Sequence, residues 1–353
     1  MQITKVEVTP VELKLKKPVR MAHIPEIHQV VAVFVRMETR QGQNAWGCTV
    51  AHPDLTGAKP KDVVRACQAC ADLVPDLHPT QVEYSLDRLS QVVGNAPAAL
   101  CAYDLAFHDL LGLLADMPLY RLLGGYRNRI PTSVTIPLAS EAESVEMAEE
   151  RARQGFRLLK VKGGLDPEDD VRRIKAIHRA LPSLAIRLDV DGGYDVRQAL
   201  DVARALRGKL EMLEQPTRPG DLDSLRQVTV NSPLPVLADQ SVVGLASALE
   251  LASSRAASGL SVKVSSCGGL RCARQVDAIA RAANLFTLAG CLIEPGLLTA
   301  AGLSFALSSP NVKYGDLDGH LDLVGDPTVA GFWLEDGCLV SSEMPGLGCT
   351  VQL

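Results

Sequence analysis

Two lysines separated by one residue are the first side chains in this sequence that point to chemistry. Lys160 and Lys162 stand in the apolar run 158–162, which is followed by Gly163 and Gly164. Because side chains at i and i+2 of a β-strand point to the same side, both ammonium groups are directed at one place. The apolar neighbours indicate that this place is inside the protein, where two cations are costly unless anions compensate them. The sequence therefore predicts a buried cationic pair with carboxylates around it.

Polar residues follow at regular intervals, several of them at the end of an apolar stretch. With steps of 27, 25, 25 and 24 positions, these residues are Lys162, Asp189, Glu214, Asp239 and Lys263. Each step has the length of one strand, one helix and two loops. Repeated units of this kind are typical of a (β/α)8 barrel, in which the carboxyl ends of the strands meet at one face. We therefore expect these side chains to converge.

Three carboxylates from successive strands form the ligand set of a hard divalent cation. Asp189, Glu214 and Asp239 have no histidine or cysteine among them, which favours Mg²⁺. A single Asp at a strand end is more often a surface charge or a salt-bridge partner. Three in strict succession, each ending an apolar run, favour a metal site instead.

The lysines can act as general bases if their pKa falls towards neutrality. Side chains two apart on a strand are roughly 6.5 Å apart, and at an effective dielectric constant of about 20 their repulsion lowers a pKa by nearly two units. Desolvation and a nearby cation act in the same direction, while the carboxylates oppose them. We therefore expect one lysine to titrate at about pH 7–8. Lys263 is expected to face Lys162 across the barrel mouth, with Lys160 stabilising the enediolate of a carboxylate substrate.

The first third of the chain reads as a separate α+β unit. The predicted elements are strands at 2–15, 28–38 and 45–49 and helices at 60–74, 81–92 and 97–116. Leu122-Leu123-Gly124-Gly125 closes this unit.

Strand candidates then alternate with helical segments. The predicted strands are 133–137, 158–162, 185–189, 212–214, 236–239, 260–263, 285–289 and 312–315. We predict an α/β fold in three parts. An α+β domain spans 1–125, a (β/α)8 TIM-type barrel spans 126–325, and a C-terminal segment at 326–353 returns to the first domain.

Composition narrows the class of partner. The net charge of −5 and the absence of basic runs argue against nucleic acid and anionic membranes. No apolar run has transmembrane length and the N-terminus has no signal-peptide core. Nine cysteines without a disulfide framework fit a reducing cytoplasm. Cys67 and Cys70 form a CxxC pattern, but it lies in a helical segment without a second pair, so we predict no metal or redox role.

The motifs together resemble the enolase superfamily, in its muconate-lactonising subgroup. The matching segments are Lys160-Val161-Lys162, Asp189-Val190-Asp191, Glu214-Gln215-Pro216, Ala238-Asp239-Gln240-Ser241 and Lys263 with Gly268-Gly269-Leu270. This resemblance extends over essentially the whole chain. It implies an enolase-like modified barrel, a capping function for the α+β domain, bound Mg²⁺, and proton abstraction next to a carboxylate. It also implies a homo-oligomer.

Within the subgroup, the sequence most resembles dipeptide epimerases. Segment 131–136, which contains Thr135, resembles their first barrel strand, and Glu294 follows a seventh strand like theirs. Asp316 and Asp318 resemble the D-x-D pair that binds the free ammonium group of a dipeptide, although Asp and Gly also favour plain solvated turns. Ile24 stands where epimerases for acidic dipeptides carry a cation. The resemblance therefore implies an L-Ala-D/L-Xaa type of substrate with an apolar or small second residue.

Several positions depart from the family pattern. Asp191 replaces the usual Asn and Gln240 the usual Glu, so the formal charge beside the metal ligands is unchanged. Cys48 stands where many relatives have Glu. Pro295 replaces the usual Ser after Glu294, which could reshape the rim of the pocket.

Other functions share the two-lysine layout. N-succinylamino acid racemase, o-succinylbenzoate synthase, muconate cycloisomerase and hydroxyproline-type dehydratase or epimerase activities stay open, although the D-x-D pair favours a free amine over an N-acylated substrate. The mandelate branch would need an Asp–His pair, and no histidine lies between 179 and 319. An alternative of another class is a catalytically idle relative that binds a small amino acid derivative or peptide, to which Gln240 and Cys48 point. Retention of the three lysines and three carboxylates disfavours it.

Overall fold

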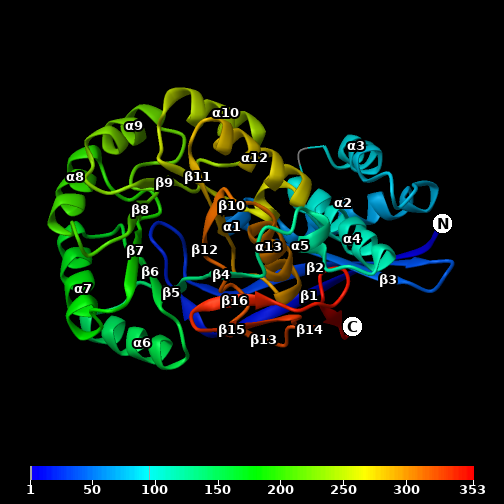
Figure 1. The fold of residues 1–353 in the computed structure, drawn as a ribbon, viewed down its shortest axis with the longest axis horizontal. Coiled ribbons are helices and arrows are strands. Elements are labelled where there is room, and N and C mark those ends of the chain that lie inside the picture. The colour runs from blue at the N-terminus through cyan, green and yellow to red at the C-terminus, as the bar shows by residue number, and fades with distance from the viewer. Residues whose placement is uncertain (1, 95) are drawn as a thin grey trace.

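The computed structural model of the chain describes residues 2–94 and 96–353. Position 1, at which the predicted capping domain begins, lies outside the described residues. Figure 1 shows strands surrounded by helices from α6 (Glu141–Arg153) to α10 (Leu245–Ser254) on one side and a separate set of strands and helices on the other.

The N-terminal strands form an antiparallel sheet. They are β1 (Ile3–Val19), β2 (Ile27–Thr39) and β3 (Asn44–Ala51). A short strand from the C-terminal part, β13 (Leu323–Val324), pairs with β1 and gives the order β13-β1-β2-β3. The predicted strands at 2–15, 28–38 and 45–49 are confirmed, but β1 continues to Val19. The loop between β1 and β2 is therefore residues 20–26.

Helical segments follow this sheet in the chain, and several of them pack on it. They are α1 (Pro53–Thr56), α2 (Pro60–Ala71), the 3₁₀ turn Val74–Asp76, α3 (Val82–Val93), α4 (Pro97–Ala115) and α5 (Leu119–Leu122). By length and composition α4 could cross a membrane, but 72 % of its apolar window is buried inside the protein, as in the core helix of a globular domain. Gly47 of β3 allows α4 to approach closely, since a Cβ there would lie 1.9 Å from the carbonyl oxygen of Ala102.

Eight parallel strands form the second sheet. They are β5 (Val134–Ile136), β6 (Leu158–Lys162), β7 (Ala185–Asp189), β8 (Met212–Glu214), β9 (Val236–Ala238), β10 (Gly259–Lys263), β11 (Phe286–Gly290) and β12 (Val312–Gly315). They are hydrogen-bonded in sequence order, and a parallel bridge between Thr132 and Gly315 joins the two edges. The predicted barrel is thereby confirmed.

Helices connect these strands. They are α6, α7 (Pro167–Ala180), α8 (Val196–Ala205), α9 (Leu222–Asn231), α10, the single turn α11 (Val264–Cys267), α12 (Leu270–Ala282) and α13 (Gly296–Ser308). In the described chain no helix follows β12, and residues 316–322 lead directly to β13. The place of an eighth helix is thus taken by a return of the chain to β1.

The C-terminal segment ties the two regions together. Its strands are β14 (Thr328–Val329), β15 (Phe332–Glu335), β16 (Cys338–Ser341) and β17 (Thr350–Val351), and β16 also pairs with β4 (Arg129–Pro131). The buried carboxylate of Asp109 on α4 accepts the backbone N–H of Trp46 at 2.8 Å and that of Leu347 at 2.7 Å. One side chain therefore joins β3, α4 and the C-terminal segment.

Asp104 on α4 fixes the N-terminal helices against the barrel. Its fully buried carboxylate accepts the backbone N–H groups of Leu270 at 2.9 Å and Arg271 at 3.1 Å, at the start of α12. A carboxylate at a helix N-terminus is stabilised by the free N–H groups and by the helix dipole. Gly269 makes this contact possible, since its φ is +118° and a Cβ would lie 2.4 Å from Asp104 Cγ.

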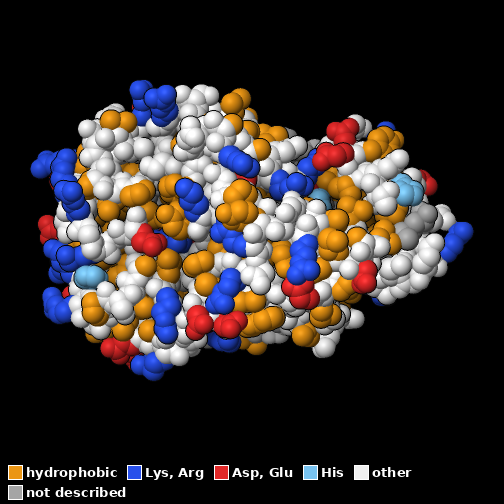
Figure 2. Space-filling model, in the orientation of Figure 1, with side chains coloured by type: hydrophobic (Ala, Val, Ile, Leu, Met, Phe, Trp, Pro, Cys, Tyr) orange, Lys and Arg blue, Asp and Glu red, His pale blue; other side chains and the backbone are white. Residues whose placement is uncertain are grey.

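Figure 2 shows how charged and apolar side chains are distributed over one face of the molecule. Lys and Arg side chains are scattered there among acidic and apolar ones and do not gather in one patch.

Candidate active site

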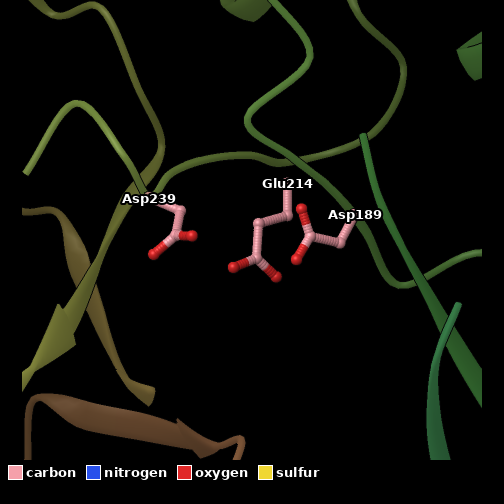
Figure 3. Close-up of side chains that lie close together, drawn as sticks. All are labelled: Asp189, Glu214 and Asp239. Atoms are coloured by element: carbon pink, nitrogen blue, oxygen red, sulfur yellow. The ribbon is translucent and has the colours of Figure 1, made fainter. Parts of the chain in front are cut away.

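Three carboxylates meet at the ends of neighbouring strands. Asp189 ends β7, Glu214 ends β8 and Asp239 directly follows β9. All three are buried, and each offers a ligand oxygen within 4.8 Å of the others. Figure 3 shows their carboxylate groups directed at one space, with Glu214 in the middle. The convergence expected from the sequence spacing is thus present.

Glu214 provides the test of whether a cation fits. Both of its carboxylate oxygens are buried, and neither has a hydrogen-bond partner among the described residues. Burial raises the pKa of Glu214 well above its usual value, and the neighbouring Asp189 raises it further. A buried carboxylate without donors is unfavourable unless a cation binds it. Three oxygen donors without nitrogen or sulfur ligands fit Mg²⁺.

The paired lysines of β6 both point into the same site. Lys162 Nζ lies 2.8 Å from Asp189 Oδ2 and 2.8 Å from Asp191 Oδ1. Lys160 Nζ forms an ion pair with Asp316 and lies 3.6 Å from Asp189 Oδ2. Both ammonium groups are buried, as their apolar neighbours in the sequence predict. Buried anions compensate each of them.

The third lysine approaches from the other side of the carboxylates. Lys263 ends β10 and forms an ion pair with Asp239. In the sheet, β7, β8 and β9 lie between β6 and β10, so Lys162 and Lys263 flank the three carboxylates. Both lysines line one cavity.

The expected lowering of a lysine pKa does not occur in this arrangement. Burial alone would lower the pKa of Lys162, but the carboxylates of Asp189 and Asp191 raise it above the usual value. Burial likewise lowers and Asp239 raises the pKa of Lys263, with a net increase. The contacts of these lysines with carboxylates outweigh the repulsion between the ammonium groups, on which the expected lowering was based.

A cavity of about 260 Å³ opens above these groups. Its lining includes the three lysines and Asp239, together with three predicted substrate-binding residues, Ile24, Thr135 and Asp318. The other two predicted substrate-binding residues, Glu294 and Asp316, lie behind this lining.

Asp316 and Asp318 therefore have different surroundings. Asp316 is fully enclosed, where it pairs with Lys160 and accepts a hydrogen bond from Ser133 Oγ at 2.6 Å. Asp318 accepts the backbone N–H of Thr135 at 2.6 Å and the thiol of Cys291 at 3.4 Å, one on each oxygen. Burial raises the pKa of Asp318, and the nearby Asp316 raises it further. A cation beside Asp318 would therefore be favourable.

Glu294 lies beneath the turn after β11. Its Oε2 accepts the backbone N–H of Leu292 at 3.1 Å, and burial raises its pKa to about 8. A Cβ at Gly319 would lie 3.0 Å from Glu294 Cγ. Glu294 thus supports the turn that carries residues 291–293 of the cavity wall.

Two residues that depart from the family pattern contact each other. Gln240 Nε2 donates to Asp191 Oδ1 at 2.7 Å, and Lys162 Nζ donates to both oxygens of Asp191. Cys48, the third such position, is fully buried in β3.

Several cavity residues were missed by the sequence analysis. They are Leu15, Val19, Met21, Asp54, Leu55, Leu292, Ile293 and Asp322. Most belong to the capping region, where no strand-end pattern marks them. The position of α1 directly after β3 is the one signal that places Asp54 and Leu55 near the barrel mouth.

Comparisons with known proteins agree with this geometry. Residues 3–124 match the family model described as the N-terminal domain of mandelate racemase/muconate lactonizing enzyme, and residues 143–353 match the enolase C-terminal domain-like model. The chain is 34 % identical to an L-Lys-D/L-Arg epimerase of Methylococcus capsulatus and 30 % identical to a hydrophobic dipeptide epimerase of Enterococcus faecalis, with 99 % of each chain covered in both cases.

A solved structure is also similar over the whole length. The dipeptide epimerase of Enterococcus faecalis V583, complexed with Mg and the dipeptide L-Leu-L-Tyr, has a TM-score of 0.95 at 29 % identity. The match covers 99 % of this chain and 100 % of that structure.

Proposed function

The chain belongs to the mandelate racemase/muconate lactonizing enzyme family of enolase-like proteins, and from this premise we propose that it is a magnesium-dependent dipeptide epimerase. One observation carries the proposal. The three carboxylates of β7, β8 and Asp239 converge on one space, and Lys162 and Lys263 flank them at the same cavity.

Asp189, Glu214 and Asp239 would hold the metal. When bound there, Mg²⁺ neutralises the substrate carboxylate and stabilises the negative charge that develops when the α-proton leaves. The family relatives include structures with Mg and a dipeptide, such as the one from Enterococcus faecalis.

The two flanking lysines would move the proton. In its neutral form, one amine would take the α-proton from one face of the carbon and become an ammonium. A cation held by Asp189 and Asp239 would favour that neutral form, because it opposes the rise in lysine pKa that these carboxylates cause. The other ammonium donates a proton to the opposite face, which inverts the configuration and consumes no further reactant. The approach of Lys162 from β6 and of Lys263 from β10, with the carboxylate-bearing strands between them, supports these roles.

Lys160 would act as a fixed positive charge. Asp316 pairs with it and Ser133 Oγ holds Asp316, so the ammonium group has a defined position. A preorganised cation of this kind stabilises the enediolate oxygens without reorganisation during the reaction.

Asp318 would bind the free ammonium group of the dipeptide. Its two oxygens are held by Thr135 and Cys291, and it lines the cavity, whereas Asp316 does not. The wall formed by Leu15, Met21 and Ile24 is apolar, which supports a second residue with an apolar surface.

Deuterium incorporation tests this function. The enzyme with Mg²⁺ should exchange the α-hydrogen of the second residue of L-Ala-L-Xaa dipeptides in D₂O and produce the L-D diastereomer. N-succinyl and other N-acyl amino acids serve as the comparison, because preference for them would favour the N-acyl racemase activity. Binding without exchange across both sets would favour the catalytically idle alternative.

The cellular context belongs to the same proposal. Nine free cysteines support a cytoplasmic enzyme, and we propose a homo-oligomer without nucleic acid or membrane partners. Light scattering on the purified protein measures the oligomeric state.

A further inference from the structure

Asp54 is a carboxylate in the cavity wall that the proposed proton transfer does not use. It lines the cavity together with Leu55, Met21 and Ile24, and its side chain is 41 % exposed. In the described part of the chain its nearest cationic candidate is His52, whose Nδ1 lies 3.9 Å from Asp54 Oδ2.

His52 does not neutralise Asp54 through this nitrogen. His52 Nδ1 accepts the backbone N–H of Asp54 at 3.2 Å, so this nitrogen is already engaged. The imidazole therefore acts as a cap of α1 and donates no hydrogen bond to the Asp54 carboxylate through this nitrogen.

A rigid turn holds Asp54 in place. The backbone N–H of Thr56 donates to His52 O at 2.8 Å and that of Gly57 donates to Pro53 O at 3.0 Å. The Thr56 hydroxyl accepts the N–H of His52 at 3.0 Å, and Gly57, with φ of +68°, ends the turn. A group on a preorganised turn loses little conformational entropy when it binds a ligand.

The charges around the cavity leave Asp54 without an assigned partner. Asp322 pairs with Arg151 at 2.7 Å, and Asp318 is assigned to the ammonium group of the substrate. Among the described lining residues, the three catalytic lysines are the only Lys or Arg side chains. The remaining wall near Asp54 is apolar, which suits the methylene stem of a long side chain.

The position of α1 indicates which part of a dipeptide Asp54 would meet. Leu55 also lines a neighbouring chamber that includes Asp239 and Lys263, so α1 borders the part of the cavity in which Lys263 lies. Asp318, which would bind the first residue, comes instead from the chain after β12. The proposed proton transfer at Lys263 therefore assigns Asp54 to the side chain of the epimerised residue.

We propose that Asp54 selects dipeptides whose second residue carries a cationic side chain, Lys or Arg. This inference rests on the proposed dipeptide epimerase function. The apolar wall contacts the methylene stem, and the Asp54 carboxylate pairs with the ammonium or guanidinium head. The apolar wall at Ile24, which led to the expectation of an apolar second residue, thus contacts the methylene stem of a longer, charged side chain.

A competing feature is Lys59, which lines the neighbouring chamber of about 570 Å³. Its ammonium group would attract an acidic side chain. Lys59 does not line the cavity that contains all three catalytic lysines, which favours Asp54.

The test compares three dipeptides with Mg²⁺ present: L-Ala-L-Lys, L-Ala-L-norleucine and L-Ala-L-Glu. Lysine and norleucine share the same carbon stem, so the ratio of their kcat/KM values reports on the ammonium group alone. We expect the wild-type ratio to be about tenfold or more in favour of lysine, the effect of about 1.4 kcal/mol. Asp54→Asn should bring this ratio close to one, and Asp54→Lys should favour L-Ala-L-Glu. High salt should reduce the wild-type ratio.

Asp87→Asn is the matched control, because Asp87 is an exposed carboxylate on α3 that lines none of the cavities described here. This variant should keep the wild-type ratio. Preference for norleucine, or a lysine preference that survives in Asp54→Asn, would overturn the inference while the epimerase function stands. Preference for L-Ala-L-Glu would also overturn it, and its loss in Lys59→Gln would assign the site to Lys59. Failure to exchange any dipeptide would remove the proposed function itself.

Discussion

Gln240 donates a hydrogen bond to Asp191 at 2.7 Å, and Asp191 in turn accepts two hydrogen bonds from Lys162. The resemblance to the enolase superfamily implies Asn and Glu at these two positions. In this chain the charge of the hydrogen-bonded pair lies on Asp191, the residue that contacts Lys162.

This contact predicts the outcome of exchanging the two residues. Gln240→Glu alone should lower kcat roughly ten- to a hundredfold. The hydrogen bond from residue 240 to Asp191 is lost, and two carboxylates then repel each other beside Lys162. The double variant Asp191→Asn/Gln240→Glu should recover most of the activity. A double variant no better than Gln240→Glu would show that the pair is not coupled.

The second prediction concerns the two flanking lysines. Lys162→Ala and Lys263→Ala should each lower epimerisation by a factor of about 10³ or more, since a general acid or base is removed. Each variant should still exchange the α-hydrogen of one stereoisomer, measured by ¹H NMR in D₂O. Normal interconversion in either variant would contradict the two-base mechanism.

The third prediction separates Asp316 from Asp318. Asp318→Asn should raise KM for free-amine dipeptides more than for N-acyl analogues, because Asp318 lines the cavity. Asp316→Asn should lower kcat for both classes, since it removes the ion pair that positions Lys160. Steady-state kinetics with both classes distinguish the two effects, and identical behaviour of the variants would argue against different roles.

The fourth prediction concerns metal and stability. Saturating Mg²⁺ should raise the free energy of unfolding by about 2–3 kcal/mol at a hundredfold excess over Kd. The reason is that it would bind the buried Glu214, whose carboxylate has no hydrogen-bond partner in the described part of the chain. Thermal unfolding with Mg²⁺ and with EDTA measures this shift. Asp239→Asn should reduce the shift, while Asp87→Asn should retain it. Turnover in EDTA would contradict the role of the metal.

The fifth prediction is a pH dependence of stability. Burial lowers the pKa of His320 from 6.5 to about 4, so the unfolded chain binds a proton there more readily than the folded chain. The stabilising contribution is complete above about pH 6.5 and is lost as the pH falls towards 4. Between pH 7 and pH 5 the wild type should lose about 1–2 kcal/mol more than His320→Phe. His28→Gln, at an exposed histidine, should behave like the wild type in urea unfolding.

The strand ends were predictable from the sequence because their periodicity is local. Each of Asp189, Glu214 and Lys263 ends an apolar run, and parallel strands joined by helices bring such ends to one face. The convergence of these carboxylates and lysines therefore follows from spacing and residue type alone.

The cavity wall was not predictable in the same way. Asp54 reaches the barrel mouth only because the N-terminal helices dock there, and that docking depends on contacts between residues far apart in the sequence, such as Asp104 with Leu270. The different surroundings of Asp316 and Asp318 also depend on tertiary packing, since both lie in one short turn. The raised pKa of Lys162 arises from contacts that no sequence spacing reports.

The anchoring of α12 by Asp104 means that the barrel and the turns of the N-terminal region can vary independently. Because α4 fixes the N-terminal region to the barrel, we expect substitutions at residues 20–26 and 53–56 to leave the lysines and carboxylates of the barrel in place. A few substitutions in those turns could therefore change which substrate is accepted, while the reaction stays the same.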